Sequence, residues 1–218
     1  MSGAMVPVTL EDLAERLLGA AEGRTRLLAA LAGPPGVGKS TTAEHLVERL
    51  NAARPGLAAI FPMDGYHFDD LVLKERGHRP RKGAPFTFDL DGFVATLERL
   101  RADPPRDVAV PVFDRSIEIA RAGGRILPAE TQIILVEGNY LLLDEPGWRD
   151  LRALFDVTIM LVAGEAVVEA RLTDRWRGFG YEGEEMVAKM EGNDLPNMRL
   201  VLHNSLPADY ALSTEGTV

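Results

Sequence analysis

The sequence reads Gly33-Pro34-Pro35-Gly36-Val37-Gly38-Lys39-Ser40, a complete G-x-x-x-x-G-K-[ST] phosphate-binding loop. An apolar run over residues 27–32 precedes the loop, and a helical pattern over residues 40–50 follows it. A strand, the loop and a helix in this order are the context that the motif requires. This context disfavours the alternative interpretation, a glycine-rich turn that binds nothing.

The residue types of this loop suit a polyphosphate. Its glycines let the backbone turn and approach the anion closely, and backbone N–H groups at the helix N-terminus then point at it. The Lys39 ammonium can reach the β- and γ-phosphates, and the Ser40 hydroxyl can ligate Mg²⁺. The loop indicates a nucleoside triphosphate without specifying the reaction. The predicted nucleotide-binding residues are Gly33, Gly36, Val37, Gly38, Lys39, Ser40 and Thr41.

Strand and helix patterns alternate along the chain. Apolar runs predict strands over residues 27–32, 57–61, 131–136 and 157–162, with a short last strand over residues 209–212. Helices are predicted over residues 10–21, 40–50, 90–101 and 165–176, the first capped by Thr9 with Asp12 and the third by Asp89. This alternation favours an α/β fold with a mostly parallel, doubly wound sheet, in one domain spanning residues 1–218.

A peripheral hairpin is expected outside this sheet. Its predicted strands are residues 108–113 and 117–119, joined by a turn at residues 114–116. Pro111 has no backbone N–H to donate to a neighbouring strand, which makes a central strand unlikely there. The hairpin is therefore expected at the edge of the fold.

The composition limits the function classes. The 218 residues include no cysteine, which excludes disulfides, thiol catalysis and zinc–thiolate sites. A net charge of −9 argues against non-specific binding to nucleic acid or to an anionic membrane. No run approaches the roughly 20 apolar residues of a membrane span, and no signal peptide is recognisable. We expect a cytoplasmic protein whose partner is a small molecule, with a homodimer left open.

Two polar clusters directly follow predicted strands. The first is Asp64-Gly65-Tyr66-His67, and the second is Glu137-Gly138-Asn139-Tyr140. Ligands of such sheets bind beyond the carboxyl ends of the strands. An acidic residue that closes a strand beside a phosphate loop holds Mg²⁺ directly or through water, which assigns Glu137 to the metal. The alternative for Glu137 is a satisfied carboxylate at a strand end.

Asp64 links nucleotide binding to a reaction. A carboxylate held opposite the loop can accept the proton of an alcohol that attacks the γ-phosphate. The alternative is that Asp64 only forms a turn with Gly65. His67 beside an aromatic residue is not assigned as a base.

Basic residues gather further along the chain. Arg171 and Arg175 share one helix face at i, i+4 spacing and are candidates for phosphate binding. The alternative is a solvated face in which they and Arg177 pair with Glu169 and Asp174.

Together these motifs resemble the phosphoribulokinase, uridine kinase and bacterial pantothenate kinase family of P-loop kinases, over roughly residues 26–212. The likeness is strongest to a subgroup labelled fructose transport system kinases. It is carried by the segments at residues 33–40, 62–67, 81–85, 88–89, 137–140 and 193–197, with Arg171 and Arg175.

The resemblance implies a three-layer fold with helices on both faces of a five-stranded parallel sheet in the order 2-3-1-4-5. It implies Mg-ATP as cofactor, Asp64 and Lys39 as catalytic residues, and a small lid over residues 171–193 that carries Arg171 and Arg175. It places the acceptor against residues 79–88 and 111–115. The predicted substrate residues are Tyr66, His67, Arg79, Lys82, Arg115, Asn139 and Tyr140.

The expected reaction is transfer of the γ-phosphoryl of Mg-ATP to a hydroxyl of a small metabolite, a sugar such as fructose. A nucleoside or a pantothenate-like acid is the alternative acceptor. Uridine kinases typically carry Asp-Ser-Phe-Tyr where this chain has residues 64–67, which disfavours a nucleoside. Arg79, Arg81 and Lys82 either bind a phosphate or carboxylate already on the acceptor or are surface charge.

Two other classes remain open. A regulatory GTPase is suggested by the D-x-x-G pattern at residues 144–147, but the chain lacks the Asn-Lys-x-Asp motif that reads guanine. An ATPase that drives assembly or transport would carry a signature such as Leu-Ser-Gly-Gly-Gln, which is also missing.

Overall fold

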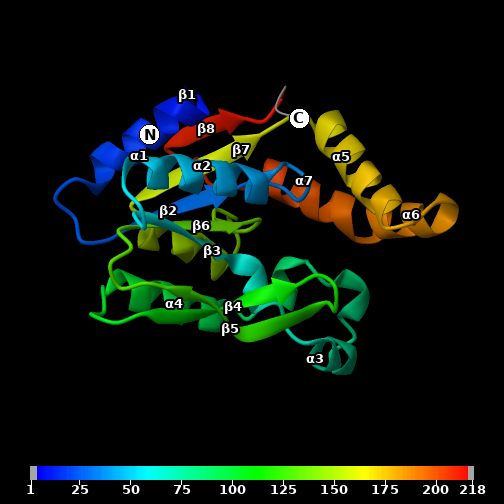
Figure 1. The fold of residues 1–218 in the computed structure, drawn as a ribbon. Coiled ribbons are helices and arrows are strands. Elements are labelled where there is room, and N and C mark those ends of the chain that lie inside the picture. Colours follow the sequence, from blue (N-terminus) through cyan, green and yellow to red (C-terminus); the bar gives the residue numbers. More distant parts are fainter. Residues whose placement is uncertain (1–3, 216–218) are drawn as a thin grey trace.

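A parallel sheet of six strands forms the centre of the computed structural model, which describes residues 4–215 (Figure 1). Across the sheet the strands are β1 (Val6–Val8), β8 (Tyr210–Ser213), β7 (Val157–Val162), β2 (Leu27–Ala32), β6 (Ile133–Gly138) and β3 (Ala58–Pro62). The five predicted strands, numbered along the chain, lie in the order 2-3-1-4-5, which confirms that expectation. The sixth strand, β1, pairs with β8 and was not predicted.

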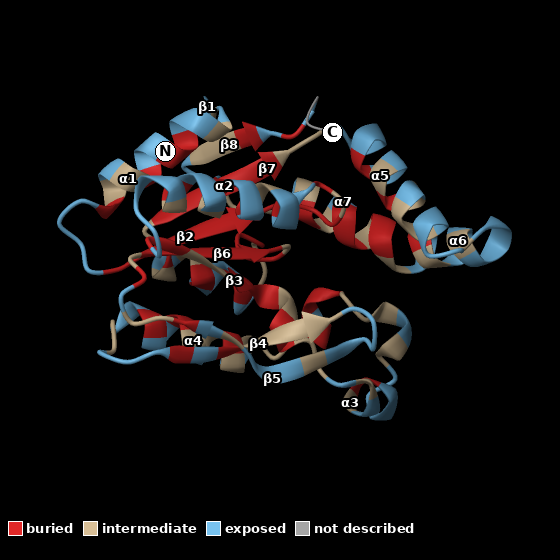
Figure 2. Cartoon of the chain, in the orientation of Figure 1, coloured by how far each residue is buried: buried red, intermediate tan, exposed pale blue. Residues whose placement is uncertain are grey.

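The two faces of the sheet bury two separate hydrophobic cores. Along β2, residues Leu28, Ala30 and Ala32 face one core, and the alternate residues Leu27, Ala29 and Leu31 face the other. Successive side chains of a strand point to opposite faces, and both faces of β2 are apolar. Figure 2 shows the central strands as buried, with exposed surface on the outer sides of the helices. The three-layer α/β arrangement is therefore confirmed.

Different helices cover the two faces. Helices α1 (Leu10–Ala21), α2 (Lys39–Ala53), α5 (Glu165–Gly178) and much of α7 (Leu195–His203) contribute to one core. Helix α4 (Leu90–Arg101) packs with the hairpin on the other (Figure 1). Helix α3 (Asp70–Glu75) lies at the hairpin end of the molecule. Short 3-10 turns at Met63–Tyr66, Arg79–Arg81, Pro85–Thr87 and Trp148–Leu154 complete the connections.

The predicted helix caps are present. The Thr9 hydroxyl accepts the Asp12 N–H at 3.1 Å, and the Asp12 carboxylate accepts the Thr9 N–H at 3.2 Å, which forms a capping box. The Asp89 carboxylate accepts the Gly92 N–H at 3.0 Å at the start of α4. These side chains satisfy N–H groups that the first helical turn leaves unpaired. Both helices begin and end at the predicted residues.

The hairpin differs from its predicted boundaries. It consists of β4 (Val108–Asp114) and β5 (Ile119–Leu127), which pair only with each other. The prediction ended the second strand at residue 119, where the strand begins. Most of β5 faces solvent, and arginine and glycine residues interrupt its apolar ones, so no apolar alternation marks it. The peripheral position inferred from Pro111 is correct.

A helical arm follows β7. Helix α5 leads to α6 (Gly183–Lys189), then to a π-helical turn at Met190–Asp194 and to α7. In Figure 1 the end of α5 and α6 extend away from the sheet. None of the helices within residues 4–215 has the length and apolar character that crossing a bilayer requires.

Candidate active site

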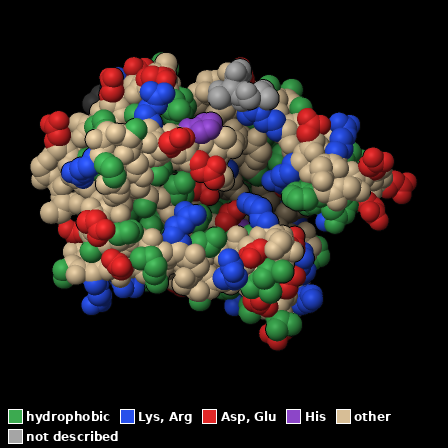
Figure 3. Space-filling view, in the orientation of Figure 1, with side chains coloured by type: hydrophobic (Ala, Val, Ile, Leu, Met, Phe, Trp, Pro, Cys, Tyr) green, Lys and Arg blue, Asp and Glu red, His purple; other side chains and the backbone are tan. Residues whose placement is uncertain are grey.

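A pocket of about 590 Å³ opens where strands β2, β3 and β6 end. Basic and acidic side chains gather around the hollow in the middle of the face shown in Figure 3. Most of the lining residues form two groups, the loop side and the hairpin side. The loop side consists of residues 35, 36 and 38–41, together with Glu137, Asn139, Arg171 and Arg175. The hairpin side consists of Asp64, His67, Arg79, Pro80, Lys82, Gly83, Phe113, Arg115 and Glu118.

The phosphate-binding loop joins β2 to the N-terminus of α2. Gly38 caps this helix with a φ of +98°, a left-handed conformation that glycine adopts without a steric penalty. The first N–H groups of α2 and its positive dipole end therefore face the pocket. The Lys39 ammonium donates to the Pro34 carbonyl at 3.0 Å, so the side chain folds back over its own loop.

Two buried groups on the loop side have shifted pKa values. Burial, reinforced by the negative charge of Asp64, raises the pKa of Glu137 to about 7. Burial lowers the pKa of Lys39 to about 8, although Glu137 and Asp64 oppose that shift. Glu137, Lys39 and Asp64 therefore lie close enough for their charges to influence one another.

Asp64 lies in the 3-10 turn that follows β3 and faces Arg115 from the hairpin. Burial favours a higher pKa for Asp64, but the surrounding basic side chains, including Arg115 and Lys39, bring the pKa below the ordinary carboxyl value. The next residue must be small, because a Cβ on Gly65 would overlap the Pro111 carbonyl. Asp64 therefore remains an anion although it is partly buried, in a turn held against the hairpin.

His67 fixes the backbone of this turn. Its Nδ1 lies 2.7 Å from the Asp64 carbonyl oxygen. Its ring packs between Phe88 and Phe113, at centroid distances of 4.1 and 4.7 Å. Burial lowers the pKa of His67, which favours the neutral imidazole. His67 is thus a packed wall residue of the pocket.

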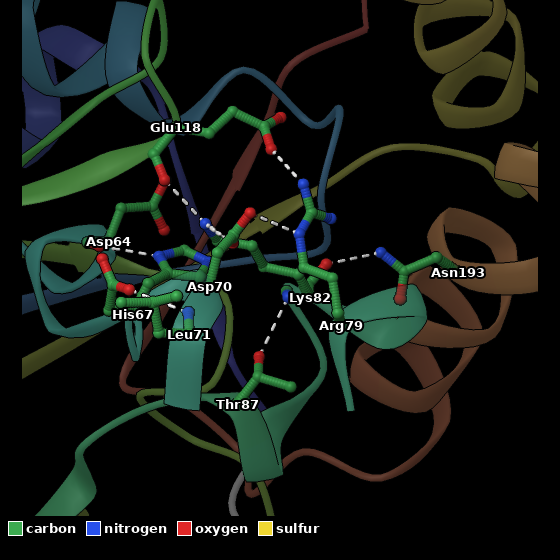
Figure 4. A network of polar contacts seen from close by, with 11 residues as sticks. Asp64, His67, Asp70, Leu71, Arg79, Lys82, Thr87, Glu118 and Asn193 are labelled. Atoms are coloured by element: carbon green, nitrogen blue, oxygen red, sulfur yellow. Dashed lines mark hydrogen bonds and ion pairs between the residues drawn. The ribbon is translucent and has the colours of Figure 1, made fainter. Parts of the chain in front are cut away.

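An ion-pair network occupies the hairpin side (Figure 4). The Asp70 carboxylate accepts from Arg79 and from Lys82, both at 2.6 Å. The Glu118 carboxylate accepts from Arg79 at 2.7 Å, and its backbone carbonyl accepts from Lys82 at 2.7 Å. The sequence left open whether these basic residues were surface charge. The structure places Arg79 and Lys82 in the pocket wall, already paired.

The two candidate phosphate-binding arginines are held differently. Arg171 donates to the Val37 carbonyl at 3.2 Å and to the Thr214 carbonyl at 2.7 Å, which ties α5 to the loop and to the end of β8. Arg175 pairs with Asp194 at 3.1 Å, and the Trp176 indole donates to the same carboxylate. The alternative interpretation, a solvated face of ion pairs, holds for Arg177, which pairs with Asp174 at 3.2 Å.

Four predicted site residues do not line the pocket. Gly33 and Val37 lie behind the loop surface, and Val37 is fully buried. Tyr66 packs against Phe61 and Phe93, and its hydroxyl donates to Thr96 at 2.7 Å. The Tyr140 side chain is fully buried and donates to the Gly83 carbonyl at 2.6 Å. The predictions placed both tyrosines against the substrate. In the structure they support the segments that line the pocket.

The prediction missed several lining residues. They are Trp176, Lys189, Asn193, Asp194 and Asn197 in the helical arm, and Glu118 in the hairpin turn. The Asn193 amide donates to the Lys82 carbonyl at 2.7 Å, so the arm contacts the hairpin side directly. The unusual run at residues 193–197 was visible in the sequence, but its partner segment lies more than a hundred residues earlier.

Comparison with known proteins finds relatives that are similar over most of the chain. The Schizosaccharomyces pombe protein named "Putative uridine kinase C227.14" is 31% identical over 210 residues, which are 93% of this chain and 89% of that protein. The Escherichia coli protein named "Uncharacterized protein YggC" is 36% identical over 191 residues, 84% of this chain and 76% of that protein. No family model matches the sequence.

A solved structure gives a further comparison. The crystal structure of a "putative fructose transport system kinase" from Silicibacter sp. TM1040 superimposes with a TM-score of 0.85. It shares 44% sequence identity and covers 94% of this chain and 98% of its own. The likeness thus extends over nearly the whole fold.

Proposed function

This chain belongs to the phosphoribulokinase, uridine kinase and bacterial pantothenate kinase family of P-loop kinases, and from that premise we propose that it transfers the γ-phosphoryl of Mg-ATP to a hydroxyl group of a sugar such as fructose. The observation that carries the proposal is the position of Asp64. Its partly buried carboxylate shares the pocket of the phosphate-binding loop and is close enough to Lys39 for each charge to shift the other's pKa.

The loop side suits a magnesium-bound triphosphate. Within the described part of the chain, no three His, Asp or Glu side chains gather as a ready-made metal site. Mg²⁺ characteristically binds through one or two protein oxygens and the phosphates of its nucleotide. Ser40 and Glu137 both line the pocket and fit that pattern. The ion would neutralise charge on the phosphoryl group when bound.

The protein groups have separate roles in the proposed transfer. The α2 N-terminus, the loop amides and Lys39 hold the phosphates and stabilise the charge that develops on them. Asp64 orients the acceptor hydroxyl and accepts its proton. The arm over residues 171–193 acts as a lid, with Arg171 and Arg175 directed at the phosphates. Closure would exclude water, which otherwise competes with the acceptor.

The choice of a sugar rests on two supports. The structure described as a fructose transport system kinase is similar over nearly its whole length. The hairpin side also offers hydrogen-bonding groups beside the aromatic Phe113, a combination that suits a polyhydroxylated ring. A nucleoside or a pantothenate-like acid is the alternative acceptor. An ATPase or a GTPase uses water and needs no acceptor site, so neither role would explain why Asp64 faces the hairpin side of the pocket.

The test is transfer of radiolabel. The chain is incubated with γ-labelled ATP, Mg²⁺ and, separately, fructose, other sugars, uridine or pantothenate, and labelled acceptor is separated from free phosphate. The proposal expects label on a sugar, with Lys39→Ala as the inactive control. Release of free phosphate alone would identify an ATPase. Label on uridine or pantothenate would show that the acceptor is a nucleoside or a pantothenate-like acid. A preference for GTP over ATP would favour the regulatory GTPase.

A further inference from the structure

The basic residues of the hairpin side are balanced by carboxylates. Arg115 pairs with Asp64 at 2.7 Å. Arg79 pairs with Asp70 at 2.6 Å and with Glu118 at 2.7 Å, and Lys82 pairs with Asp70 at 2.6 Å. Three cations thus face three carboxylates. An anionic acceptor needs a cation that is free to bind it, because transfer of an unpaired charge out of water is unfavourable.

Asp70 is the residue that both Arg79 and Lys82 share. It does not line the pocket but lies behind these two side chains, at the centre of the network in Figure 4. Only 8% of the Lys82 side chain is exposed, so its ammonium is directed by Asp70 and by the Glu118 carbonyl. Asp70 belongs to the first turn of α3, whereas Glu118 lies in the exposed hairpin turn. Asp70 is therefore the more firmly placed counter-charge.

These ion pairs disfavour binding of an anionic acceptor more than binding of an uncharged one. A phosphate or carboxylate on the acceptor would have to compete with Asp70 for the donors of Lys82 and Arg79. It would also meet the negative charges of Asp70, Glu118 and Asp64 at close range. A hydroxyl group can instead donate to these carboxylates or accept from remaining N–H groups without adding charge.

We propose that the pocket selects an uncharged polyhydroxylated acceptor, and that Asp70 is a specificity-determining residue that keeps Arg79 and Lys82 from binding anionic acceptors. This inference rests on the proposed kinase function and narrows it. It separates a neutral sugar from the sugar acids, sugar phosphates and pantothenate-like acids that the sequence left open.

The experiment uses two matched probes, D-glucitol and D-gluconate, which are open-chain six-carbon compounds. At one end D-glucitol carries a hydroxymethyl group and D-gluconate carries a carboxylate. Their binding is measured by calorimetry with the pocket's loop side filled by a non-hydrolysable ATP analogue and Mg²⁺. The variants are Asp70→Asn and, as a control for loss of one carboxylate, Asp150→Asn. Asp150 is exposed and lies outside the pocket.

Wild type and Asp150→Asn are expected to bind D-gluconate no more tightly than D-glucitol. Asp70→Asn is expected to gain at least ~10-fold in D-gluconate affinity relative to D-glucitol, the size of one charge-assisted hydrogen bond. Should Asp70→Asn fail to fold, Glu118→Gln, which removes one of the two carboxylates that pair with Arg79, is expected to show a smaller gain in the same direction.

Two results would overturn the proposal. One is binding of D-gluconate by wild type at least tenfold more tightly than D-glucitol. The other is a folded Asp70→Asn variant, or in its place Glu118→Gln, without any gain in D-gluconate affinity over wild type. Because both probes are measured by binding, the result is independent of turnover. Failure of the radiolabel transfer would therefore contradict the kinase function without deciding this inference, and the reverse also holds.

Discussion

The carboxylate of Asp64 and the guanidinium of Arg115 form an ion pair of 2.7 Å on the hairpin side of the pocket. The Arg115 side chain is 66% exposed, so the pair contributes little to stability, about 0–1 kcal/mol. The pair instead orients the Asp64 carboxylate, because Arg115 donates to Oδ2 of this proposed base.

We expect Arg115→Gln to lower kcat about 10-fold, the effect of one lost charge-assisted hydrogen bond, with little change in Mg-ATP affinity or in Tm. Steady-state kinetics and thermal unfolding measure the two effects. Arg149→Gln is the matched control, since its exposed pair with Asp144 at 3.1 Å lies outside the pocket. An equal loss of kcat in both variants would remove the orienting role.

Lys39 provides the test of the phosphate-binding loop. Its ammonium is buried beside Glu137 and close to where phosphoryl charge must be stabilised. Lys39→Ala is expected to lower kcat by at least ~100-fold, the scale for loss of one electrostatic stabiliser in a water-excluded site. Near-normal turnover by a folded Lys39→Ala protein would mean that the loop is not the catalytic phosphate site.

The pKa values on the loop side predict a pH window for nucleotide binding. Mg²⁺ needs the Glu137 carboxylate, whose pKa of about 7 means that affinity falls as the pH drops below that value. The phosphates need the Lys39 ammonium, whose pKa of about 8 means that affinity falls as the pH rises above it. Mg-ATP affinity should therefore be highest between these two pKa values.

Titration calorimetry from about pH 6 to about pH 9 checks this window in the wild type and in Glu137→Gln. The variant should bind Mg-ATP more weakly and lose the acidic side of the profile, while the alkaline side remains. An acidic side that persists unchanged in Glu137→Gln would assign that titration to another group.

Nucleotide binding is expected to replace one ion pair of the predicted lid. Arg175 pairs with Asp194 at 3.1 Å in this structure, and the phosphates of ATP would compete with that carboxylate. We expect amide hydrogen exchange across residues 179–193 to slow when an ATP analogue and Mg²⁺ bind, because the arm then closes over the loop. In Arg175→Gln the slowing should be lost. Exchange that the nucleotide leaves unchanged in the wild type would count against a lid.

Much of the fold is predictable because the sheet is buried on both faces. Strands such as residues 157–162 are near-continuous apolar runs, and their alternation with helices favours the parallel arrangement. Strand β1 escaped prediction because Val6-Pro7-Val8 is short, contains proline and pairs only at the sheet edge. Strand β5 escaped because a solvent-facing hairpin strand needs no apolar pattern.

The site is predictable where residues follow strands and unpredictable where distant segments meet. Asp64 lies just after β3, and Glu137 lies at the end of β6. Because the ends of parallel strands meet at one edge of the sheet, the sheet topology brings both residues to the phosphate-binding loop. The pairing of Arg175 with Asp194, and of Lys82 with Asp70, depends on how helices and turns pack. Tyr66 illustrates the limit, because an aromatic beside a candidate base looks the same in sequence whether it faces substrate or core.

The most direct test of the kinase assignment is the rate of phosphoryl transfer by Asp64→Asn, measured with ATP and Mg²⁺ affinities on the same preparation. Asparagine keeps the size of the side chain but is not a useful proton acceptor. We expect unchanged ATP and Mg²⁺ binding and a loss of transfer of about 100-fold or more, the range for a missing general base. Normal turnover, or a loss of Mg²⁺ affinity that parallels the loss of rate, would contradict the assignment of Asp64 as the base.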